Sequence, residues 1–296
     1  MMLYSTGIIL SIACAIAWGV NSVLLRWMQS EPAWQTLGTS VGNLVISALV
    51  FPWHQICKIA PAAVTVSFMS GITWAIGMYL HICSIPLVGI SRAVPICGGF
   101  QVVFNALFGW LAMGELPGSS LGKVSVIVGV FLIVMSMLFI GGSEWAFDKE
   151  ELRRRGLFLP IMAALVFSLY VAPVRYFGIP GEIAALPQAV GMVTGSVGLM
   201  SFRNRQRTPL PLRKFSFSMI CLPGLVWGTG NVLLLLALSS IGISVSFALT
   251  RLSVVISSCF GVFYFKETGT EHSYSVLLAG LMNILGSTLV SIANSL

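Results

Sequence analysis

The sequence predicts an all-α integral membrane protein, with about ten transmembrane helices in two inverted five-helix repeats. The first observation is composition: 57% of the 296 residues are hydrophobic, 8% are charged and the mean hydropathy is +0.95. A soluble core wrapped in a polar surface does not have this composition. The second observation is a series of long apolar runs, and the third is a repeat that relates the two halves of the chain.

The apolar runs are long enough to be membrane-spanning helices, because about 20 apolar residues cross a hydrocarbon core about 30 Å thick. Alternation over about ten residues, the pattern of a barrel strand, is absent. The first run follows no basic residue and is too long for the apolar core of a signal peptide, so we expect a retained span. The predicted spans are 7–28, 35–57, 61–83, 88–113, 119–140, 156–177, 182–202, 215–239, 242–265 and 273–294.

Basic residues predict the orientation. They gather in the connections after the fifth and seventh spans, and with Arg26 and Lys266 they give one side about eleven basic residues against about three. By the positive-inside rule that side is cytoplasmic, in a plasma (inner) membrane, and both termini are extracytoplasmic. The net charge of +7 then follows from topology, so no nucleic-acid partner is expected. Anionic lipid remains an alternative partner of the basic segment 203–214.

The second half of the chain repeats the first. Spans one and six align with Trp18 on Phe167 and Arg26 on Arg175. The other matched segments are QTLGTSVG from Gln35 with QAVGMVTG from Gln188, GITWAIG from Gly71 with GLVWGTG from Gly224, GIS from Gly89 with GIS from Gly242, and FGWLAMGE ending at Glu115 with FGVFYFKE ending at Glu267.

This repeat predicts the domain organisation. We expect a first repeat over 1–141, a charged cytoplasmic linker over 142–155 and a second repeat over 156–296. Since each half holds an odd number of spans, the second half enters the membrane inverted. Inverted repeats build secondary transporters that hold substrate near the midplane, where the halves meet.

Three segments resemble the drug/metabolite transporter superfamily of EamA-like proteins, and most closely its glucose/ribose porter family. They are QTLGTSVG in span two, the pattern of Pro95, Gly99, Gln101 and Asn105 in span four, and SVVISSCFGVFYFKE in span nine. The resemblance implies sugar uptake, with possible proton coupling. It also implies a central cavity lined by spans one, three, four, six, eight and nine.

Arg251 departs from this resemblance, because porters of this type tend to carry a neutral amide there. It lies near the centre of predicted span nine, where an arginine costs roughly 2.5 to 3.5 kcal/mol. In one interpretation Arg251 binds an anionic substrate through two parallel hydrogen bonds. In the other it is structural and satisfied by helix-end carbonyls or a protein acid, although no acidic residue falls at mid-span.

Further polar and aromatic residues recur at helical spacing on span faces and could line a cavity with aromatic walls and amide groups. In the alternative interpretation the amides bridge helices and the tryptophans only pack. With Arg251, the predicted substrate-binding residues are Trp18, Asn21, Gln101, Asn105, Trp74, Trp227 and Asn231.

Four residues are predicted hinges or gates. Pro95 and Pro173 lie inside apolar runs, where proline removes a backbone hydrogen bond and permits a kink. Glu115 and Glu267 end spans four and nine on opposite faces of the membrane, as structural ends or gate contacts. His81, near the end of span three, fits a hydrogen-bonded interfacial residue better than a proton-coupling group.

Neither an enzyme nor a cofactor-binding protein is indicated. The sequence has no HExxH motif and no CxxC pair, and its sole aspartate, Asp148, excludes an intramembrane aspartyl pair. The prediction is an alternating-access transporter of a small polar metabolite, a sugar or an anionic compound. Two alternatives stay open: an EamA-type exporter of amino acids or related metabolites, and a membrane sensor that binds a ligand without moving it. The coupling ion and the oligomeric state also stay open.

Overall fold

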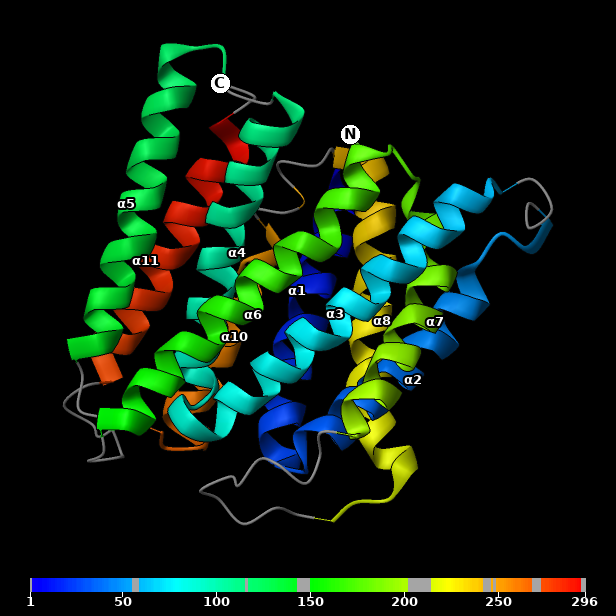
Figure 1. Cartoon of the computed structure of the whole chain (residues 1–296). Coiled ribbons are helices and arrows are strands. Elements are labelled where there is room, and N and C mark those ends of the chain that lie inside the picture. Colours follow the sequence, from blue (N-terminus) through cyan, green and yellow to red (C-terminus); the bar gives the residue numbers. More distant parts are fainter. Residues whose placement is uncertain are drawn as a thin grey trace.

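The structure, a computed structural model, describes residues 2–54, 59–114, 117–142, 150–201, 214–241, 246, 249–267 and 273–293. Within these ranges the regular elements are all helical, which confirms the predicted all-α fold class. Figure 1 shows long helices that cross one layer in alternating directions. Seven of the described helices are long and apolar enough to span a membrane.

The helices follow the predicted spans closely. In the first half they are α1 (Met2–Met28), α2 (Pro32–Val50), α3 (Pro61–Val88), α4 (Ile90–Met113) and α5 (Ser120–Gly142). In the second half they are α6 (Glu150–Tyr176), α7 (Gly181–Met200), α8 (Phe217–Ile241), α10 (Leu252–Cys259), the π-helix η3 (Phe260–Tyr264) and α11 (Ser273–Ile292). Because α6 begins at Glu150, the last part of the charged connection 142–155 is helical.

Span nine differs from the prediction. Arg251 does not lie inside a continuous helix but in a turn between helical Thr250 and the first residue of α10, Leu252. The span then ends in η3, and short π-helical segments of this kind are frequent at functional sites. Arg251 therefore lies at a helix break.

Local sequence explains several helix ends. Proline occupies the first position of α2 and α3, where its missing N–H costs no helical hydrogen bond. The chain passes from α3 to α4 through Gly89 alone, whose φ of +77° is readily adopted by glycine. This single-residue turn places the start of α4 directly beside the end of α3.

The two halves pack on one another through reciprocal helix pairs. α1 packs on α8 as α3 packs on α6, and α2 packs on α8 as α3 packs on α7. Glycines allow the close approach, because a Cβ on Gly71 would lie within 2.8 Å of the Met192 nitrogen and one on Gly42 within 2.6 Å of the Leu225 nitrogen. The interfaces that surround the centre of the protein are thus built from both halves.

The helix ends define two faces of the layer. Both chain termini lie on one, which we call the terminal face (Figure 1). At the opposite face α1 and α7 end and α6 and α8 begin. We call this the charged face, because those helix ends carry Arg26, Arg155 and Lys214. The distribution of basic residues predicts that the charged face is cytoplasmic and the terminal face extracytoplasmic.

Candidate functional site

A cavity of about 580 Å³ lies between the two halves, a volume typical of small-molecule sites. Its walls come from α1, α3, α4, α6, α8 and the start of α10, with contributions from α5 and α11. These include the six spans that the family resemblance implied.

All eight predicted substrate-binding residues line this cavity. Each has a polar or aromatic side chain, and all but Arg251 lie within a helix. They are Trp18 and Asn21 of α1, Trp74 of α3, Gln101 and Asn105 of α4, Trp227 and Asn231 of α8, and Arg251. The structure therefore brings together residues that lie up to 233 positions apart in the sequence, between Trp18 and Arg251.

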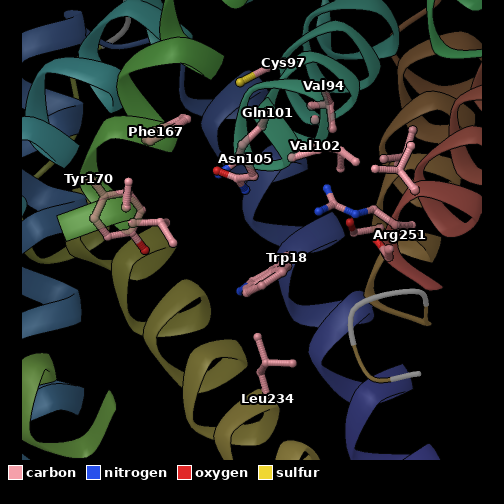
Figure 2. A pocket seen from close by; sticks show the side chains of 18 of the residues that line it. Trp18, Val94, Cys97, Gln101, Val102, Asn105, Phe167, Tyr170, Leu234 and Arg251 are labelled. Carbon is pink, nitrogen blue, oxygen red and sulfur yellow. The ribbon is translucent and has the colours of Figure 1, made fainter. Parts of the chain in front are cut away.

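Two aromatic residues of α6, Phe167 and Tyr170, also line the cavity, and we did not single them out from the sequence. Figure 2 shows both beside Gln101 and Asn105, with Trp18 below. A signal was present in the repeat, which places Phe167 on Trp18 and hence Tyr170 on Asn21. Equivalent helices of the two halves therefore contribute equivalent positions to the cavity wall.

The two tryptophans that the repeat matches meet across the molecule. The Trp74 and Trp227 rings lie 5.0 Å apart between centroids at 49°, and Trp74 also contacts Phe167 at 6.3 Å. Trp74 is 1% exposed, so it packs in the core while one edge reaches the cavity. The sequence left two alternative roles for Trp74, packing between helices and lining the cavity. In the structure it does both.

Several polar atoms at the cavity wall are buried without a protein partner. Among the described residues, Trp18 Nε1, Asn21 Oδ1, His81 Nδ1 and Arg251 Nε have no hydrogen-bond partner. Most buried polar atoms in proteins are paired, so such a group points to a ligand or water as the missing partner.

His81 was expected to be a hydrogen-bonded interfacial residue. It is instead 8% exposed, it lines the cavity and its ring contacts Phe167 at 6.4 Å between centroids. The expectation was wrong because α3 continues to Val88, which moves His81 inward from the helix end.

Arg251 points into the cavity from the helix break (Figure 2). A Cβ built on Gly98 would lie 3.7 Å from its Nη1 atom, so the glycine leaves room beside the guanidinium. Within the described part of the chain Arg251 has no hydrogen bond and no ion pair, and no acidic residue lines the cavity. No described acid therefore compensates this charge.

At the charged face, Glu267 joins three segments. Arg26 Nε at the end of α1 donates to Glu267 Oε1 at 2.7 Å, and the Arg26 guanidinium lies 5.2 Å from the Phe265 ring centroid. The N–H groups of Ile90 and Ser91 donate to the two carboxylate oxygens at 3.1 and 2.9 Å. Glu267 thus caps the N-terminus of α4, where a negative charge is favoured.

We call this arrangement of Arg26, Glu267 and the first turn of α4 the latch. Gly89 and Gly261 make room for it, since a Cβ on Gly261 would lie 2.6 Å from Glu267 Oε2. The Glu267 side chain is only 4% exposed, so its charge is compensated by the latch rather than by solvent.

The other three predicted hinge and gate residues are Pro95, Pro173 and Glu115. Pro95 and Pro173 lie inside α4 and α6, which continue through them. The carbonyl of Pro95 accepts a hydrogen bond from Asn283 Nδ2 of α11 at 2.9 Å. Glu115 lies outside the described residues.

Comparison with known proteins identifies the family. Residues 9–293 match the family described as "Sugar transport protein". The chain is 31% identical over 288 residues to the "Probable glucose uptake protein GlcU" of Bacillus cereus (strain ATCC 10987 / NRS 248), covering 95% of this chain and 96% of the relative. It is 29% identical over 284 residues to the "Glucose uptake protein GlcU" of Bacillus subtilis (strain 168), with the same coverage.

These relatives are named for uptake rather than catalysis, in line with the expectation that the chain is not an enzyme. A solved structure that is 13% identical over 98% of both chains superposes with a TM-score of 0.57, which shows a shared fold. Because the family match extends over nearly the whole chain, the protein is a multi-pass membrane protein that belongs to the sugar transport protein family.

Proposed function

We propose that the protein is a secondary transporter that takes up a sugar or sugar-like compound by alternating access. The observation that carries this proposal is the cavity between the halves, whose wall combines aromatic rings with amide side chains. The names of the relatives support a sugar as substrate. The reciprocal helix pairs that join the two halves support rocking around a central site.

The cavity chemistry suits a polyhydroxylated ring. The faces of Trp18 and Trp227 offer apolar surface to the C–H groups of a sugar. Asn21, Asn105 and Asn231 offer amide donors and acceptors to its hydroxyls. We therefore assign substrate contact to the eight residues predicted from the sequence, and add Tyr170 across the cavity.

We infer that the cavity opens toward the terminal face. Trp110, Arg175 and Ala293 line the cavity and lie near the ends of α4, α6 and α11 at that face. The latch closes the charged face. With the orientation predicted from charge, this state receives substrate from outside the cell and is the starting state for uptake.

Switching requires the latch to break and the opposite side to close. Glu267 is assigned as a gate residue, and Glu115, its partner in the repeat, is the predicted gate residue of the terminal face. Pro95 and Pro173 are assigned as hinges, because each removes one helical hydrogen bond within a helix that lines the cavity.

Uptake by the purified protein in sealed vesicles tests this function. We expect radiolabelled glucose or a related sugar to accumulate faster than in protein-free vesicles, and unlabelled substrate to raise the melting temperature of the detergent-solubilised protein. Asn105→Leu should slow uptake, whereas Asn204→Leu, in the connection after α7, should not. Ligand-dependent stabilisation without flux would identify a sensor instead, and amino-acid efflux would identify the exporter alternative.

A further inference from the structure

The charged residues of the cavity indicate which class of sugar it binds. Two arginines line it, Arg251 and, near the terminal face, Arg175, and none of the lining residues in the described part of the chain is acidic. The Glu267 carboxylate, in the latch, already binds Arg26 and the start of α4. Arg251 therefore places a positive charge within a membrane span, where an uncompensated guanidinium is unfavourable.

Resting on the proposed function, we propose that the cavity selects sugars that carry a carboxylate group, such as aldonates and uronates, and that Arg251 binds this group. A guanidinium and a carboxylate form two parallel hydrogen bonds and cancel each other's charge. The hydroxyls of a neutral sugar supply hydrogen bonds but no compensating charge.

The position of Arg251 supports an anion at this end of the site. Arg251, Ser253 and Val254 all line the cavity, so the first turn of α10 belongs to its wall. The N-terminus of a helix carries a partial positive charge that adds to the guanidinium. The helix break in span nine thus places two sources of positive potential at one point of the cavity.

The surroundings of Arg251 orient the ligand. Gly98 leaves open space beside Nη1, and Val94 and Val102 nearby offer no polar group. Trp18, Gln101 and Asn105 lie across the same space (Figure 2). A ligand that fills it places its carboxylate at Arg251 and its hydroxylated chain or ring against the amides and Trp18.

A monoanion fits better than a dianion. Among the described lining residues Arg175, near the terminal face, is the one arginine besides Arg251, and none is a lysine. A sugar phosphate, which carries close to two negative charges at neutral pH, would leave part of its charge unpaired. Sugar phosphates therefore serve as a competing class in the test.

The experiment measures binding by thermal stabilisation of the full-length wild type and of Arg251→Gln and Arg251→Lys, with glucose, gluconate, glucuronate and glucose 6-phosphate. We expect a sugar acid to bind wild type at least about 10-fold more tightly than glucose, and Arg251→Gln to lose about 10- to 100-fold in affinity for the acid but little for glucose. Arg251→Lys should fall between, because lysine keeps the charge but not the paired geometry.

Each contrary outcome has a definite meaning. Glucose binding wild type and Arg251→Gln equally, with no binding of acids, would overturn the inference and leave the proposed function standing. Tightest binding of glucose 6-phosphate would overturn the choice of carboxylate. If no sugar of any class bound or moved, the proposed function itself would fail. If Arg251→Gln does not fold, the affinities of the wild type for a sugar acid and for glucose still decide whether the cavity selects a carboxylate.

Discussion

Trp18 both packs on a neighbouring helix and lines the cavity. Its ring lies on Gly230 of α8, where a Cβ would come within 2.7 Å of Nε1 and Cδ1. Trp18 lines the cavity wall, and its buried Nε1 atom has no hydrogen-bond partner among the described residues. The ring thus packs on α8 and carries one unpaired donor beside the cavity.

Trp18→Phe should weaken substrate binding with little loss of stability. Phenylalanine keeps most of the ring on Gly230 but removes the donor, and one neutral hydrogen bond is worth about 0.5 to 1.5 kcal/mol, or roughly 2- to 12-fold in affinity. Uptake kinetics in vesicles should show this as a raised KM. Trp53→Phe is the matched control, since Trp53 Nε1 donates to the Ala48 carbonyl at an exposed site. An unchanged KM in Trp18→Phe would assign Trp18 to packing alone.

The polar part of the cavity could be predicted from sequence because polar groups are costly inside a membrane. Asn21, Asn231 and Arg251 stand out within apolar runs, and helical spacing suggests which of them share a face. Phe167 and Val254 could not be recognised in this way, because an aromatic or aliphatic residue that lines a cavity looks the same as one that faces lipid. Only the repeat distinguishes Phe167, by its match to Trp18.

At the scale of elements, glycines set how closely the helices of the two halves approach. A Cβ on Gly71 of α3 would meet the backbone of Gln188 and Met192 in α7, and one on Gly191 would meet the backbone of Phe68 in α3. Backbone atoms of packed helices cannot move aside as a flexible side chain does. These positions therefore tolerate no side chain without separation of α3 from α7.

Gly71→Ala should destabilise the protein by about 1 to 3 kcal/mol, the usual cost of overpacking a well-packed contact. Gly198→Ala in α7 is the control, because a Cβ there has no atom within 4 Å and alanine favours the helix. Thermal unfolding in detergent should show a lower midpoint for the first variant and an equal or higher midpoint for the second. Equal unfolding midpoints for the two variants would mean that α3 and α7 can move apart at little cost in free energy.

The extents of most helices could be predicted, since length and apolar composition suffice where a helix crosses a membrane. The break at Arg251 and the π-helix η3 could not be predicted from the sequence. From Ile243 to Cys259 the sequence has neither glycine nor proline, so no local signal marks an interruption. The break depends on tertiary surroundings, namely the cavity that receives Arg251 and the latch that anchors the end of η3.

For the whole molecule, the latch and the cavity occupy opposite sides of the layer. The cavity extends toward the terminal face, while Glu267 holds the end of η3, the end of α1 and the start of α4 together at the charged face. Alternation between two states requires that each side be held closed by contacts comparable in free energy, because a large imbalance would leave one state unpopulated. At the charged face the latch supplies an ion pair and two charge-assisted hydrogen bonds, so its strength contributes to this balance.

Glu267→Gln should therefore shift the molecule away from the state open to the terminal face. Loss of the carboxylate charge weakens three hydrogen bonds, and charged hydrogen bonds contribute about 1.5 to 3 kcal/mol each, so the ratio of the two states should change by about 10-fold or more. Cys97 reports the change, because it lines the cavity and can be kept as the single cysteine by replacing the other five.

In wild type we expect a membrane-impermeant thiol reagent to label Cys97 from the terminal face only, and in Glu267→Gln labelling from the charged face should rise by about 10-fold. Right-side-out and inverted vesicles separate the two directions. Glu182→Gln is the control, since Glu182 lies exposed in the first turn of α7, away from the latch. If labelling stayed the same from both faces while the variant melted earlier, Glu267 would be a cap that stabilises α4 in every state, and the gate would have to lie elsewhere.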